Sequence, residues 1–380
     1  MASSAKIAAL FLCLSIILSS CYFFPSGLPQ PTDFLSLIGF IFLIVNPKIL
    51  KFLTQQLFAR KFLIGFLSCF IIANIYSLRF YPDVTFWGAF LGIAYIIFNL
   101  AIYLSFNFFS KEISTYPMFL NSCLLCAFID FISTYVQQGL RGSGFMNNPN
   151  QFGSHILSLL IISILFSKSN LVSWKTILIF ALLITPAIQT GSKAALVGGI
   201  PIIISVAFSL IFNIKRNLFL LFEFLKNKSL YILIILVMAS VVLFMFPEQV
   251  EKFINIFSNA LDFTNQRIES SVNESDSDLW HGRNIYLITK LTWIDWFTGI
   301  GYYRYYQRLG ETFEIHSLFP SLIVISGVFS FIFFTLFVLF RLKRNINFLA
   351  WSSIFSLVLY SITHQLFRDT NMWIILGLMR

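Results

Sequence analysis

Charged side chains are scarce in this sequence, and their scarcity excludes most classes of soluble protein. Asp, Glu, Lys and Arg make up 11% of the 380 residues, whereas soluble domains contain about 25%. Hydrophobic residues reach 58%, and the mean hydropathy is +0.83. We therefore expect an all-α, polytopic membrane protein in which residues 1–380 form a single integral membrane domain.

Cysteine is also scarce, and the motifs that hold metals are missing. The five cysteines all lie in or beside apolar segments, at Cys13, Cys21, Cys69, Cys123 and Cys126. The Cys123-x-x-Cys126 pair has no second pair to complete a zinc site, and no H-E-x-x-H motif accompanies the four histidines. These absences favour packing roles for the cysteines over redox or metal chemistry. The sequence predicts no metal site and no cofactor.

Long apolar runs occupy most of the chain. Runs of roughly 17–25 residues suit a membrane-spanning helix. The sequence has about 11–12 candidates, at 7–24, 34–46, 62–78, 86–106, 117–136, 150–167, 174–190, 193–213, 229–246, 317–340, 346–363 and 370–380. The last is too short to cross, because eleven helical residues rise only about 16 Å. No internal repeat is evident.

The lysines and arginines orient these spans. With the N-terminus in the cytoplasm, fourteen lie in inner loops, at Lys48, Lys51, Arg60, Lys61, Lys111, Lys168, Lys175, Lys215, Arg216, Lys226, Lys228, Arg341, Lys343 and Arg344. Four lie in short outer loops, at Arg79, Arg141, Lys193 and Arg368. Cytoplasmic loops are enriched in these residues, so we expect this orientation. Because the basic residues gather on one side, the net charge of +10 does not indicate nucleic-acid binding.

One long polar interval, residues 247–316, separates the ninth and tenth predicted spans. It holds ten of the sixteen acidic residues, and the orientation places it outside the cytoplasm. Its apolar spacing predicts amphipathic helices over 247–268 and 284–298, joined by a serine-rich acidic linker over 269–279. Gly299-Ile300-Gly301 closes the second helix. A long loop in a membrane protein is commonly where function resides.

Polar residues at helix starts on the outer side are candidates for binding an anion. Arg141 precedes a glycine-rich turn in which Asn148 suits an N-cap, and Pro149 the first helical position. Unpaired backbone N–H groups beside an arginine can hold a phosphate. Polar residues also lie at the starts of predicted helices at Lys193, at His316-Ser317 and at Arg368. The alternative is that these are ordinary charges near lipid headgroups.

Two further residue types have competing interpretations. Asp130 lies inside the fifth predicted span, and an intramembrane carboxylate is a functional candidate. It could equally pair with a cation such as Arg141 as a structural tie. All four histidines lie near the outer face, and each could be a hydrogen-bonding cap or a catalytic base.

Four motifs occur in a fixed order on the predicted outer side. They are Arg141 to Asn150, Thr190 to Ala195, Arg283 with Trp296 and Gly299-Ile300-Gly301, and His316-Ser317 with Gly327. In the order of these motifs, their spacing and the membrane side on which they are predicted to lie, residues 120–330 resemble a known superfamily. It is the O-antigen ligase and polymerase superfamily, the Wzy and WaaL type of integral membrane glycosyltransferase. Lys193 stands where the family usually has arginine. It keeps the charge but lacks the bidentate fork.

The resemblance implies a substrate and a mechanism. Such enzymes transfer a glycan from a polyprenyl (undecaprenyl) pyrophosphate carrier, at the outer face of the bacterial cytoplasmic membrane, without metal or nucleotide. Arg141 and Arg283 would bind the pyrophosphate. His316 would accept a proton from the acceptor hydroxyl or donate a hydrogen bond to the pyrophosphate. The expected substrate-binding residues are Lys193, Asn148, Asn150, Ser317, Asp130 and Arg368.

Three functions are compatible with these features. The favoured one is a polymerase of O-antigen or capsule repeat units, with membrane lipids and a chain-length regulator as partners. A ligase would bring a phosphate-rich lipid A core to the 247–316 loop, whose six basic and ten acidic residues give a net charge of −4. That charge would repel such an acceptor. A flippase or transporter of the lipid-linked sugar is the third alternative, but transporters commonly show internal repeats.

Overall fold

The computed structural model describes the protein over residues 3–24, 29–136, 143–146, 148–167, 173–212, 283–311, 313–343, 348–364 and 369–379. It also describes six isolated positions, at residues 251, 255, 258, 259, 262 and 266. The predicted helix over 247–268, apart from those positions, and the predicted linker over 269–279 therefore lie outside the described residues. So does the predicted span 229–246.

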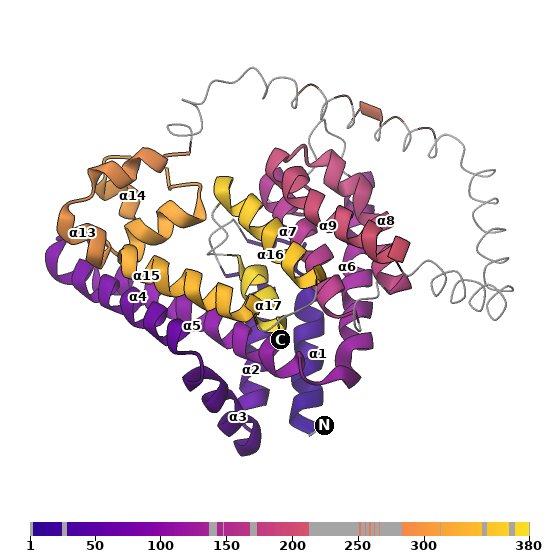
Figure 1. The fold of residues 1–380 in the computed structure, drawn as a ribbon, viewed down its shortest axis with the longest axis horizontal. Coiled ribbons are helices and arrows are strands. Elements are labelled where there is room, and N and C mark those ends of the chain that lie inside the picture. Colours follow the sequence, from indigo (N-terminus) through magenta and orange to yellow (C-terminus); the bar gives the residue numbers. More distant parts are fainter. Residues whose placement is uncertain are drawn as a thin grey trace, which may run out of the picture.

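Helices and no strand occur among the described residues, as expected (Figure 1). They are α1 (Ser3–Ile17), α2 (Pro31–Ile44), α3 (Pro47–Phe58), α4 (Lys61–Phe80), α5 (Phe86–Phe109), η1 (Ile113–Thr115), α6 (Tyr116–Val136), α7 (Pro149–Leu165), α8 (Trp174–Gln189), α9 (Lys193–Phe212), η2 (Ile285–Lys290), α13 (Trp293–Thr298), α14 (Tyr305–Arg308), α15 (Leu318–Lys343), α16 (Phe348–Thr363) and α17 (Thr370–Leu378).

Five of the described helices, α4, α5, α6, α9 and α15, are long and apolar enough to cross a membrane. Four more are apolar but shorter: α1, α7, α8 and α16. Helices α2 and α3 form a pair bent by 107° that together pass the same test. The sequence did not predict α3, which falls in an expected inner loop. Asn46 caps it by accepting from Lys48 and Ile49, and Pro47 occupies its first position.

Helix α17 lies in the middle of the molecule (Figure 1). It packs against α5 and α7, and every side chain from Met372 to Leu378 is buried. Gly377 allows the close approach, since a Cβ there would lie 2.6 Å from the Tyr103 carbonyl oxygen. The buried guanidinium of Arg341 donates to the carbonyls of Leu376 and Gly377, at 3.1 and 3.2 Å. An arginine suits these carbonyls because the C-terminal end of a helix is partially negative.

The segment 283–316 folds against α4 and α15. Tyr81, at the end of α4, donates from its hydroxyl to Asp295 of α13 at 2.7 Å, and Arg308 pairs with Asp83 at 3.1 Å. The prediction of one continuous helix over 284–298 is wrong. Thr292 starts a new helix there, because its hydroxyl and the Asp295 carboxylate form a capping box.

A kink in α15 receives the Gly299-Ile300-Gly301 turn. Gly327 has φ 80° and ψ 167°, which interrupts the helix. The carbonyls of Val324 and Ile325 accept from the N–H groups of Ile300 and Gly301, at 2.9 and 3.0 Å. Backbone hydrogen bonds therefore hold the segment 283–316 on the bundle, and they fix where Arg283 and His316 emerge.

Candidate functional site

The start of α7 has the local structure that the sequence predicted. Asn148 is the N-cap, and its side-chain oxygen accepts from the Gln151 N–H at 2.9 Å, with Pro149 at the first helical position. Gly153 lets the start of α9 approach, because its added Cβ would lie 2.9 Å from the Ser192 Cβ. Lys193, the first residue of α9, is therefore close to the first turns of α7.

Arg283 and His316 are brought side by side by backbone pairing. The N–H of His316 donates to the Arg283 carbonyl at 3.1 Å. Asn284, which has a left-handed φ of 55°, donates from its side chain to the Phe313 carbonyl at 2.9 Å. The structure thus joins two residues that the sequence assigned to one site from opposite ends of the segment 283–316.

Helices α7, α16 and α17 meet beside this pair. Tyr360 of α16 donates from its hydroxyl to the Asn150 carbonyl at 3.0 Å. Ser154 of α7 donates to the Asp369 carboxylate at 2.7 Å. Both Asp369 and Arg283 lie close enough to act electrostatically on Tyr360. A cation, a carboxylate and two hydroxyls therefore converge where these helices meet the segment 283–316.

The environment of His316 favours its neutral form. Its side chain is exposed, so a substrate can reach the ring. Desolvation by the surrounding chain lowers the pKa of His316, and the positive charge of Arg283 lowers it further. The carboxylate of Glu314 acts in the opposite direction but with the smallest effect. A neutral imidazole can accept a proton, as a general base must.

The other predicted residues divide into two groups. Ser317 is buried, and its hydroxyl donates to the Ser361 carbonyl at 3.4 Å, so it ties the start of α15 to α16. Asn148 uses its side-chain oxygen as a cap. Arg141 and Arg368 lie outside the described residues, and so does His281.

Sequence reasoning missed Ser154 and Tyr360, and it noted Asp369 only as part of the helix start Arg368-Asp369-Thr370. Tyr360 and Ser154 lie inside apolar segments, where nothing in the pattern marks them as polar partners. Asp369 had a usable signal, because it immediately precedes the last apolar run. It is the N-cap of α17 and accepts from the Asn371 N–H at 2.9 Å.

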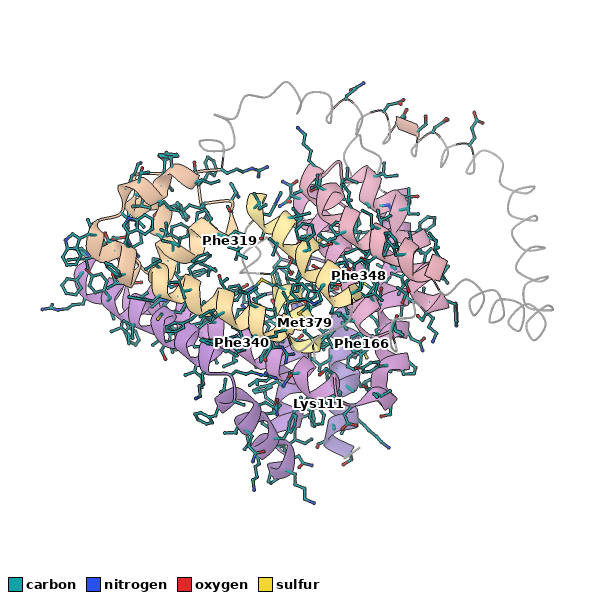
Figure 2. The ribbon with its side chains drawn as sticks, in the orientation of Figure 1. Lys111, Phe166, Phe319, Phe340, Phe348 and Met379 are labelled. Carbon is teal, nitrogen blue, oxygen red and sulfur yellow. The ribbon has the colours of Figure 1, made fainter. Side chains whose placement is uncertain are left out.

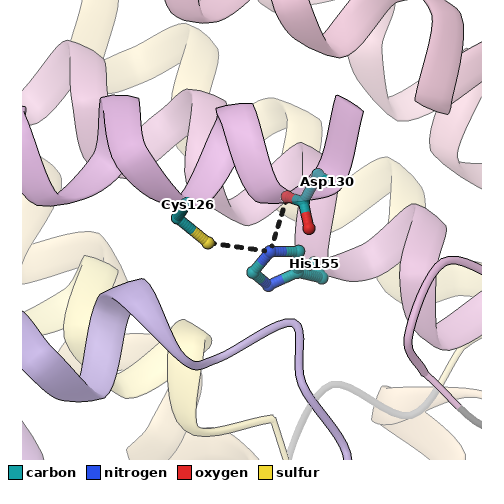
Figure 3. A group of neighbouring side chains, drawn as sticks. All are labelled: Cys126, Asp130 and His155. Atoms are coloured by element: carbon teal, nitrogen blue, oxygen red, sulfur yellow. Dashed lines mark hydrogen bonds and ion pairs between the residues drawn. The ribbon is translucent and has the colours of Figure 1, made fainter. Parts of the chain in front are cut away.

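A second polar cluster, Cys126, Asp130 and His155, lies inside the bundle (Figure 3). His155 Nε2 is 3.0 Å from Asp130 Oδ2 and 3.5 Å from Cys126 Sγ. All three side chains are buried. Among the described residues Asp130 has His155 as its ion-pair partner; a pairing with Arg141 falls outside them. Cys126, for which the sequence favoured a packing role, is buried in the core and its thiol also contacts the His155 ring.

The signal for this cluster was present in the sequence. Cys126 and Asp130 are four residues apart, so they share one face of α6. The Cys-x-x-Cys spacing drew attention instead to Cys123, which lies on α6 and is buried among apolar side chains. Only the fold brings His155 of α7 to the face that carries Cys126.

Comparison with known proteins gives no further information on the site, because no family model, curated protein or solved structure matches the chain. The site itself therefore carries the functional argument. A guanidinium beside a helix start can bind a phosphate, and an exposed neutral histidine beside it can move a proton.

Proposed function

We propose that this protein polymerises lipid-linked oligosaccharide repeat units by transfer from a polyprenyl pyrophosphate carrier. The proposal includes a bacterial cytoplasmic membrane, a cytoplasmic N-terminus, 11–12 spans and an outer loop over 247–316. The observation that carries it is the pairing of Arg283 with a neutral, exposed His316. Arg283 also acts electrostatically on Tyr360, whose hydroxyl donates to the Asn150 carbonyl at the start of α7. The resemblance of the motif order to polymerases and ligases of this type supplies the reaction.

In the proposed reaction, the acceptor hydroxyl oxygen bonds to the anomeric carbon of the donor glycan. The bond from that carbon to the pyrophosphate breaks, and the pyrophosphate leaves with the electron pair. Arg283 stabilises the negative charge that develops on the leaving group, with Lys193 and Arg141 in support. His316 accepts the hydroxyl proton. Asp369, held by Ser154, is placed to bind sugar hydroxyls.

The first experiment reconstitutes the protein in liposomes with purified lipid-linked repeat unit and resolves the products by length. We expect a ladder of polymer from the wild type. Arg283→Ala should remove a charged transition-state contact worth roughly 3–4 kcal/mol, which lowers the rate hundreds-fold. Arg283→Lys should restore part of the rate, since it keeps the charge without the planar fork.

The matched control is Arg79→Ala, which removes an exposed cation at the end of α4. It should polymerise at the wild-type rate. Equal rates for Arg283→Ala and wild type would remove Arg283 from the mechanism. A wild-type protein that makes no ladder, but transfers preformed glycan to a lipid A core, would be a ligase and would overturn the proposal.

A further inference from the structure

The Cys126–Asp130–His155 cluster has the ligands and the spacing of a transition-metal site. The three potential ligand atoms, Sγ, a carboxylate oxygen and an imidazole nitrogen, lie within 4.8 Å of one another. Thiolate, carboxylate and imidazole are the ligand types that Zn²⁺ takes in proteins, at about 2.0–2.3 Å. In a tetrahedral site, those bond lengths separate neighbouring ligand atoms by roughly 3.3–3.7 Å. The observed distances from His155 Nε2 are 3.0 Å to Asp130 Oδ2 and 3.5 Å to Cys126 Sγ. Only a small increase in the shorter distance would reach the tetrahedral range.

The geometry argues against a nucleophilic thiol. In a thiol–imidazole–carboxylate relay the thiol and the carboxylate contact opposite ring nitrogens. Here both contact Nε2 of His155. Nδ1 of His155 and Oδ1 of Asp130 are buried without a hydrogen-bond partner among the described residues. The second ring nitrogen that such a relay needs is therefore not engaged.

Charge balance also suits a divalent ion. A carboxylate and a thiolate ligand carry two negative charges, which a divalent ion cancels when the imidazole ligand is neutral. The bound site therefore adds no net charge to the bundle interior, where membrane proteins strongly disfavour one. Because thiol and imidazole bind a metal in their deprotonated forms, the affinity should fall as the pH falls.

A surface hollow lies near the cluster. A hollow of about 370 Å³ is lined by Cys21, Tyr22, Phe23, Gly144, Phe145 and Met146. Cys21, which lines the hollow, lies close enough to Asp130 for that carboxylate to act on its thiol electrostatically. The hydroxyl of Ser19, in the same connection after α1, lies 3.7 Å from Cys126 Sγ. It is placed to contact a coordinated thiolate.

We propose that Cys126, Asp130 and His155 bind one Zn²⁺ or a similar first-row divalent transition ion. The ion joins α6 to α7 next to Ser154 and leaves a fourth coordination position open. This assignment is independent of the proposed polymerase activity, because it concerns binding of the ion alone.

The test loads full-length protein in detergent with Zn²⁺, removes loosely bound ion and measures zinc per chain. We expect one zinc per chain in the wild type. Cys126→Ser, Asp130→Asn and His155→Gln should each weaken binding by more than the roughly 10–100-fold that loss of an outer-shell partner costs. Cys123→Ser is the matched control, because Cys123 is equally buried on the same helix but outside the cluster. It should keep full zinc.

Co²⁺ provides a direct report on the thiolate. Loading with Co²⁺ should produce a thiolate-to-metal charge-transfer absorption in the wild type and in Cys123→Ser, and none in Cys126→Ser. A wild-type protein that retains no stoichiometric zinc and shows no such absorption would overturn the proposal. So would a Cys126→Ser variant that still shows it. The wild-type measurement can contradict the proposal by itself, so the test does not depend on whether every variant folds.

Discussion

His316 links the electrostatics of the site to a measurable pH profile. Desolvation and Arg283 hold its pKa below the ordinary 6.5. If neutral His316 is the base, activity is lost as the pH falls through this lowered pKa. The acidic limb of the rate profile should therefore lie below pH 6.5. Polymerisation by the reconstituted protein, measured across the acidic range, checks this.

Glu314→Gln supplies the control, because among the described residues Glu314 raises the pKa of His316. Its loss should move the acidic limb to still lower pH while leaving the rate at neutral pH unchanged. Arg283→Lys, which keeps the positive charge, should leave the limb near its wild-type position at a lower rate. An unmoved limb in Glu314→Gln would mean that another group controls the profile.

At the residue level, sequence rules succeeded where the interaction is local. The Asn148 cap and the Pro149 start were predicted because both depend on neighbours in the chain. The Ser154–Asp369 hydrogen bond joins α7 to α17, and no local pattern encodes such a pairing. The carboxylate of Asp130 was recognised as a candidate, but its His155 partner depends on how α6 and α7 pack.

At the level of elements, apolar runs predicted the long helices. They did not predict the helix interruptions, which depend on specific backbone and capping contacts. Among the described residues, the long helices coincide with predicted apolar runs, because a spanning helix must keep its polar backbone bonded internally. The kink at Gly327 has a different origin. It arises where the 299–301 turn and α15 share backbone hydrogen bonds, and neither segment alone shows this. The break at Thr292 is local, because Thr292 and Asp295 form a capping box.

Gly327→Ala tests that contact. A Cβ at this position would lie 2.0 Å from the Phe297 carbonyl oxygen. The φ and ψ of Gly327 also fall in a region that only glycine readily adopts, which costs other residues about 1–3 kcal/mol. We expect a lower Tm in detergent and loss of polymerisation, because the segment that carries Arg283 and His316 is displaced.

Gly199→Ala is the matched glycine control. Gly199 lies inside helix α9, and nothing is within 4 Å of an added Cβ. Alanine is favoured over glycine in a helix by up to about 1 kcal/mol, so the Tm should stay the same or rise. Equal Tm values for Gly327→Ala and the wild type would show that the turn is not held as described.

At the scale of the whole molecule, the order of apolar runs did not reveal which helices are neighbours. Helix α4 packs against α15, and α9 packs against α16, although each pair is far apart in the chain. Within the bundle, aromatic side chains fill these contacts, as where Phe66 lies 5.2 Å from Phe334 between ring centroids. With 47 phenylalanines in the chain, apolar pattern alone offers many equivalent pairings.

The two ends of the bundle differ in a way that predicts its orientation. At one end Asp83, between α4 and α5, pairs with Arg308 of the segment 283–316. At the other end, burial together with the charges of Arg60 and Arg341 lowers the pKa of Lys111. Figure 2 shows Lys111 well away from α13 and α14 as they are labelled in Figure 1. The end with the cluster of cations is the one expected in the cytoplasm.

A reporter that is active only outside the cytoplasm tests this orientation when fused to truncated chains. Fusions after Asp83 and after Gly310 should be active, because both positions belong to the end that carries the candidate site. Fusions after Glu112 and after Lys343 should be silent, because both lie at the cation-rich end. A reporter active only within the cytoplasm should give the complementary pattern and controls for expression. The reverse result would place Arg283 and His316 in the cytoplasm, where a donor carried on the outer face of the membrane cannot reach them.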